Sequence, residues 1–184
     1  FHDRFENKQM RLDEEQRQAI ALDRARRKGD HVEAAGYLNV LGDACRRRGE
    51  TAAAIEHHKS EVRECKLAAE RDRGAGTSAC GARRVDIAAA HRFLSLAYKE
   101  HGSGERALTA LVAAQSILID VQRATAPNPL QDRATDRSKR RAGVHRSAKV
   151  ELQRVEVELG NGYLAQCGAF DAEGDAVRSV RLLH

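Results

Sequence analysis

Two neighbouring histidines and two glutamates are the residues of this chain whose types and spacing come nearest to a metal site. His57 and Glu61 stand four residues apart, which would place both side chains on one face of a helix. Glu56 and His58 lie beside them, but no third ligand falls on the same face. We therefore predict no metal site and expect these four residues to be exposed polar positions of a helix.

Residue patterns that support catalysis are missing from the sequence. It contains no GxSxG turn, no P-loop, no HExxH motif and no dinucleotide fingerprint, and the run GAGTSACG lacks the preceding strand and following lysine of a phosphate cradle. Four cysteines form no CxxC pair: Cys45, Cys65, Cys80 and Cys167. We therefore predict no catalytic residue, no cofactor, no disulfide framework and no enzyme activity.

A basic run extends from Arg137 to Arg141, with Arg133 and Arg146 flanking it. Such a run could contact phosphate or serve as a nuclear localisation signal, and the net charge of +5 permits either role. However, 27 acidic residues are interspersed along the chain, and only 4% of the residues are aromatic. Because stacking platforms are missing, we favour a solvated loop over a nucleic-acid site.

A repeated spacing of small and apolar residues predicts the elements that carry these side chains. Three pairs of corresponding residues have the same separation: Gly42 with Ser95, Gly49 with Gly102, and Ala54 with Ala107. A partial third copy follows at Leu159, Gly160 and Tyr163. Since the positions of two successive helices shift together, the pattern indicates a repeated unit of two helices.

Each small residue has a mechanical role in such a unit. Gly42 would let the partner helix approach closely, Gly49 would end the first helix in a conformation with positive φ, and Ala54 would lie where the helices cross. This arrangement is typical of tetratricopeptide hairpins. We therefore predict an all-α fold in which tetratricopeptide hairpins stack as a right-handed superhelix, an α-solenoid.

The same pattern predicts the organisation of the chain. An amino-terminal helix in residues 1–30 should pack on the first repeat, and residues 31–184 should form repeats over about 31–69, 86–121 and 148–184. We expect loop insertions near 71–84, which is rich in glycine, and near 122–147, which contains Pro127 and Pro129. No run approaches the ~20 apolar residues of a membrane span. The chain stops within an expected helical unit, so we expect a fragment of a longer protein.

Residues one step round from the apolar stripe of each first helix should face the concave groove of the superhelix. In the first repeat these are Asn39, Asp43 and Arg46, in the second Arg92, Leu96 and Lys99, and in the third Val157, Asn161 and Leu164. Arginine, lysine and asparagine side chains can hold an extended peptide through its carbonyl and carboxylate groups. We therefore predict a peptide-binding groove, although each residue alone could equally be ordinary wet surface.

One family resembles the chain more closely than tetratricopeptide proteins in general. Residues 19–65 read AIALDRARRKGDHVEAAGYLNVLGDACRRRGETAAAIEHHKSEVREC and resemble the amino-terminal repeats of the Tonsoku (Brushy) family, especially its plant-type members, in their GD, LGD and RGE steps. The stretches AAHRFLSLAYKEHGSGERALTALVAAQSI and ELQRVEVELGNGYLAQ match the next two units in order. The chain departs from the family at His91, where a larger apolar residue is usual, and in the two insertions.

The resemblance implies a nuclear scaffold that acts at damaged or stalled replication forks, promotes homologous recombination and binds histones, with the repeat domain receiving the histone H3 tail. It implies a protein or peptide partner, whereas the expectation of no membrane and of no direct nucleic-acid contact comes from the composition described above. The alternative is a cytoplasmic adaptor resembling the Pins or kinesin light chain repeats. A smaller alternative is nucleic-acid binding through residues 137–141.

Overall fold

A computed structural model describes residues 2–74, 80–126 and 136–172 of the chain. Every regular element in this part is an α-helix, which confirms the prediction of an all-α fold. The helices are α1 (His2–Lys28), α2 (His31–Arg47), α3 (Thr51–Gly74), α4 (Cys80–Glu100), α5 (Gly104–Thr125) and α6 (Asp136–Ala172). None of the described helices is long and apolar enough to cross a membrane.

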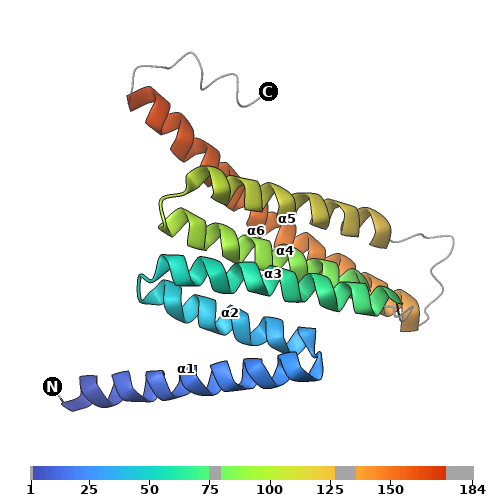
Figure 1. Ribbon diagram of the computed structural model, residues 1–184. Coiled ribbons are helices and arrows are strands. Elements are labelled where there is room, and N and C mark those ends of the chain that lie inside the picture. Colours follow the sequence, from blue (N-terminus) through green and yellow to red (C-terminus); the bar gives the residue numbers. More distant parts are fainter. Residues whose placement is uncertain (1, 75–79, 127–135, 173–184) are drawn as a thin grey trace.

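Helices α1 to α5 are stacked in chain order, and α6 runs behind α4 and α5 (Figure 1). Each packs against the next one from α1 to α6, and α4 also contacts α2 and α6. Three apolar clusters fill the layers: Leu22 and Ala25 of α1 pack with Leu38 on α2, a second cluster joins α2, α3 and α4, and a third joins α4, α5 and α6. The later part of α1 thus lies against the first hairpin, as its apolar spacing predicts.

Three of the turns repeat the same backbone geometry. The first is at Gly29 between α1 and α2, with φ of 67° and a hydrogen bond from the Asp30 N–H to the Ala25 carbonyl. Gly49 between α2 and α3 and Gly102 between α4 and α5 have φ of 77° and 78°. In each turn the next residue donates its backbone N–H back into the first helix, from Glu50 to Cys45 and from Ser103 to Tyr98. Because L-residues with side chains rarely adopt positive φ, glycine is the residue that permits this reversal.

Small residues bring the paired helices close together where the spacing predicts it. A Cβ on Gly42 would lie 2.6 Å from Cε1 of His58, so the bare α2 backbone touches a side chain of α3. Ala54 and Ala107 are buried. In the third copy Gly160 is exposed with nothing within 4 Å and Gly162 lies against Leu108, while a partner helix after α6 would fall outside the described residues.

Both predicted insertions are shorter than expected. α3 extends to Gly74 and α4 begins at Cys80, so the ends of the 71–84 segment are helical. α5 extends to Thr125 and α6 begins at Asp136, so much of 122–147 is helical as well. Residues 75–79 and 127–135, with both prolines, lie outside the described residues.

The charged segment that begins α6 is helical because it has its own apolar anchor. Val144 and Ala148, four residues apart, pack into the cluster shared with α4 and α5. Arg141 donates to the backbone carbonyls of Ala124 and Ala126, both at 3.1 Å, and thereby caps the end of α5. Beyond this point α6 continues as one helix to Ala172. The helix reversal expected within 148–184 therefore does not occur before residue 173, and residues 173–184 lie outside the described part of the chain.

Candidate peptide-binding site

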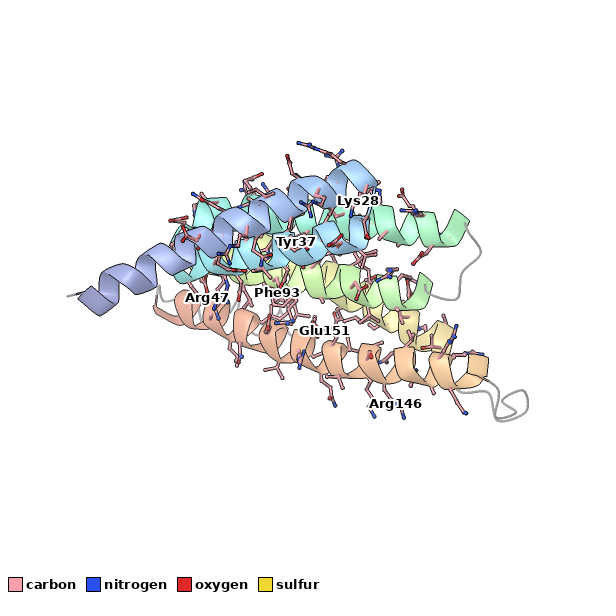
Figure 2. The ribbon with its side chains drawn as sticks, turned by 90° about the horizontal axis from the view of Figure 1, so that it is seen from below. Lys28, Tyr37, Arg47, Phe93, Arg146 and Glu151 are labelled. Atoms are coloured by element: carbon pink, nitrogen blue, oxygen red, sulfur yellow. The ribbon has the colours of Figure 1, made fainter. Side chains whose placement is uncertain are left out.

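A pocket of about 360 Å³ opens between α2, α3 and α4. Its walls carry short side chains from all three helices, among them Ala35 and Gly36 of α2, Ala68 of α3 and Ala89 of α4. The larger lining residues are Val32, Asn39, Glu61, Cys65, Arg83, Asp86 and Phe93. Phe93 lies in the middle of this side of the molecule (Figure 2). The pocket is therefore an apolar hollow with a few polar groups, which is the usual composition of a binding site.

The carboxylate of Glu61 is the buried polar group of this pocket, with the residue 5% exposed. Nδ2 of Asn39 donates to its Oε1 at 3.0 Å, and Nδ1 of His58 lies 2.8 Å from its Oε2. Among the described residues no lysine or arginine forms an ion pair with Glu61, since His58 is its only basic neighbour within ion-pair distance. A buried carboxylate held by a neutral amide and an imidazole can still accept a further cationic donor.

His58 supports Glu61 from inside the α2–α3 contact. Its side chain is fully buried, and its ring stacks on Phe93 with centroids 5.9 Å apart and an interplanar angle of 17°. The expectation that His58 and Glu61 are exposed is therefore wrong. The physical reason is Gly42, whose missing side chain leaves the space that the imidazole fills.

Metal chemistry finds no support in the described residues, where no group of three histidine, cysteine, aspartate or glutamate side chains could hold an ion. His57 is partly buried, and its pKa is lowered by burial and by the neighbouring His58. Burial likewise raises the pKa of Cys65 to about 12, so the thiol in the pocket wall stays protonated and is a poor nucleophile. The polar chemistry of the pocket is that of hydrogen bonds and charge.

The rim of the pocket carries a second carboxylate. Arg83 donates to Asp86 at 3.1 Å and to Asp72 at 3.0 Å, so one guanidinium is shared between two carboxylates. Together with Glu61, these groups give the region a negative balance. A cationic side chain entering the pocket would meet this field.

The structure places three of the predicted groove residues on α2. Asn39 lines the pocket and binds Glu61. Asp43 and Arg46 bind each other at 3.0 Å, and Arg46 also binds Glu100 of α4 at 2.5 Å. Arg46 thus joins α2 to α4, while Asp43 pairs with arginines of its own helix, and the prediction that both line a peptide groove stays a prediction.

On α4 the predicted groove residue Arg92 reaches α6. Arg92 donates to Glu151 at 2.6 Å and to Glu158 at 3.3 Å, and its guanidinium carbon lies 4.6 Å from the ring centroid of Phe93. It therefore joins α4 to α6 (Figure 2, which labels Glu151). The adjacent Phe93, not Arg92, faces the pocket.

The other predicted groove residues lie apart from the pocket lining. Leu96 is half-buried, and Lys99 and Asn161 are exposed, as are Val157 and Leu164. The sequence analysis also missed two pocket residues, Val32 and Gly36. Both lie on the same face of α2 as Asn39, nearer the start of that helix, so their spacing could have identified them.

These features define an all-helical protein with one candidate peptide-binding pocket. In comparisons with known proteins, no family model, no curated protein and no solved structure matches the chain. The function is therefore argued from the pocket itself and from the residues that line it.

Proposed function

We propose that the chain is a protein-interaction scaffold built from tetratricopeptide hairpins and that it binds rather than catalyses. Two observations support this architecture. The α2–α3 and α4–α5 hairpins share a positive-φ glycine turn, and both bury an alanine early in the second helix. Helical hairpins that stack with one repeated geometry form an extended concave surface, which such proteins use to bind peptides.

The proposed ligand is an extended peptide that places a lysine or arginine side chain in the pocket. The observation that carries this proposal is Glu61, a buried carboxylate at the pocket wall without a lysine or arginine partner among the described residues. The aliphatic stem of the ligand would lie along Ala35, Ala68 and Ala89, and its charged head would reach Glu61 and Asp86.

The resemblance to the Tonsoku family suggests a specific source for such a peptide. A histone H3 tail is rich in lysine and arginine, and the negative balance of the pocket suits it. On this proposal the protein is a nuclear genome-maintenance factor that acts at replication forks in homologous recombination and uses the pocket to recognise H3.

A titration followed by fluorescence anisotropy tests the proposal. An H3-tail peptide is compared with a version in which glutamine replaces its lysines and arginines. Glu61→Gln removes the charge and keeps the shape, and should weaken binding about 10- to 100-fold, because hydrogen bonds to charged groups contribute about 1.5 to 3 kcal/mol. Glu56→Gln is the matched control on the exposed side of α3, where Glu56 pairs only with Lys59 among the described residues, and should bind like wild type.

The proposal fails if Glu61→Gln binds the basic peptide as tightly as the wild type does. It also fails if the neutral peptide binds equally well. A clear preference for neutral or acidic peptides would instead favour the cytoplasmic adaptor resembling Pins or kinesin light chain.

A further inference from the structure

The positive charge of this chain is concentrated in one segment. Residues 137–150 contain six lysines and arginines and no acidic residue, whereas the whole chain has 32 basic and 27 acidic residues and a net charge of +5. The rest of the chain therefore has no positive excess. The segment lies in the first part of α6, which the structure shows to be helical rather than a loop.

The anchoring of α6 directs most of these charges to solvent. Val144 and Ala148 face the apolar cluster, and Arg141 is bound to the end of α5. Lys139, Arg140, Arg146 and Lys149 are exposed, and we call these four residues the basic face of α6. Figure 2 shows Arg146 directed away from the bundle.

Three members of the basic face have no polar partner in the described part of the chain. Arg140, Arg146 and Lys149 make no hydrogen bond or ion pair there. By contrast, Arg46, Arg83 and Arg92 each bind two carboxylates. The charges of Arg140, Arg146 and Lys149 are thus available to an external anion.

We propose that the basic face of α6 binds the phosphate backbone of duplex nucleic acid, independently of the peptide pocket. Arg140 and Lys149 are nine residues apart, which is about 14 Å along a helix. On a duplex with one phosphate per about 3.4 Å of each strand, this length spans about four phosphates. Ala142, Gly143 and Ser147 lie between the charges, so no bulky side chain prevents close approach, and the Ser147 hydroxyl can donate to phosphate.

Two other anionic partners fit the surface less well. Single strands are held largely by stacking on aromatic rings, and residues 137–150 contain no phenylalanine, tyrosine or tryptophan. A membrane-surface helix inserts a large apolar face, whereas the apolar side of this segment is packed on α5 and its exposed large hydrophobic residue is Val150, at 49%. Charge without aromatic or apolar groups favours sequence-independent binding to a duplex.

The test is a fluorescence anisotropy titration of the whole chain with a duplex of about 20 base pairs. With about four phosphate contacts, affinity should fall roughly 100-fold between about 50 mM and 200 mM salt. The triple variant Arg140→Gln, Arg146→Gln and Lys149→Gln should bind at least about 10-fold more weakly at the lower salt. The slope of its log affinity against log salt concentration should correspond to about three fewer phosphate contacts. The matched control replaces three exposed arginines of other helices, Arg24, Arg63 and Arg106, with glutamine.

Circular dichroism spectra and melting curves establish that both triple variants are folded. The proposal is wrong if the wild type does not bind the duplex at low salt, or if the α6 variant and the control lose the same affinity. A preference for a single strand, or binding to anionic lipid vesicles without binding to the duplex, would also overturn it. Peptide binding through Glu61 is unaffected by any of these results, so the two proposals fail separately.

Discussion

Replacing Gly42 with alanine should destabilise the protein, although alanine normally favours a helix. An added Cβ would lie 2.6 Å from Cε1, 2.7 Å from Nε2 and 3.0 Å from Nδ1 of His58. The imidazole is fully buried, bound to Glu61 and stacked on Phe93. Because the contact is with the ring itself rather than with the end of a flexible chain, the helices must move apart or His58 must leave its site.

Three free-energy terms give the size of the effect. Overpacking in a well-packed interior costs about 1 to 3 kcal/mol. Displacing His58 would sacrifice its hydrogen bond with Glu61, a bond to a charged group that is worth about 1.5 to 3 kcal/mol. Alanine gains about 1 kcal/mol over glycine within a helix. We expect a net loss of about 2 kcal/mol, which lowers the melting temperature of a chain of this size by about 4 to 8 °C.

Thermal and urea unfolding followed by circular dichroism measure this loss. Gly36→Ala is the matched control, because Gly36 lies in the same helix and an added Cβ there has nothing within 4 Å. It should stabilise the protein by about 0.5 to 1 kcal/mol. In a His58→Ala background the clash is gone, so Gly42→Ala should become much less harmful.

The result that refutes this reasoning is a Gly42→Ala protein that melts at or above the wild-type temperature. An equal cost of Gly42→Ala with and without the His58 ring would also refute it, since the loss would then come from another source. We expect Gly42→Ala to lower the free energy of unfolding and Gly36→Ala to raise it.

Two further predictions concern charged and titratable groups near α4. Arg92→Ala leaves the buried Glu151 without this partner, so urea unfolding should show a loss of about 3 to 5 kcal/mol, whereas Lys99→Ala at an exposed position should change stability by less than about 0.5 kcal/mol. The pKa of His91 is lowered from 6.5 by burial and by Lys66, so the stability contributed by the neutral imidazole is present above about pH 6.5 and is lost as pH falls through the folded pKa. His91→Leu should therefore reduce the drop in melting temperature at acid pH. An unchanged drop would contradict this reasoning.

The helical hairpins could be predicted because their signals are local. Gly49 and Gly102 end helices within one turn of the residues they follow, and the 3.6-residue period of apolar positions identifies the buried stripe. Gly42 was assigned to a helix crossing from the same local pattern, and the structure places His58 against it. The turns depend on residues close in sequence and could be predicted from spacing, whereas the spacing did not reveal that the His58 ring fills the space at Gly42.

The long-range partners of two predicted groove residues could not be read from the sequence. Arg92 binds carboxylates on α6 and Arg46 binds Glu100 on α4, and no local pattern reveals these pairs. The length of α6 was missed for a similar reason. Its charged start looks like a solvated segment until Val144 and Ala148 are seen to pack against helices that precede it in the chain.

The pocket and the tight α2–α3 crossing arise from the same kind of residue in different surroundings. Gly42 faces α3, which is free to approach, and His58 fills the gap. Ala35, Gly36 and Ala89 lie where α2 and α4 face each other, and both helices pack on α3. Here the short side chains line a hollow instead of a close contact. The same kind of residue thus gives a tight contact or a hollow according to what faces it from elsewhere in the chain, which is why the sequence indicated the crossing and not the pocket beside it.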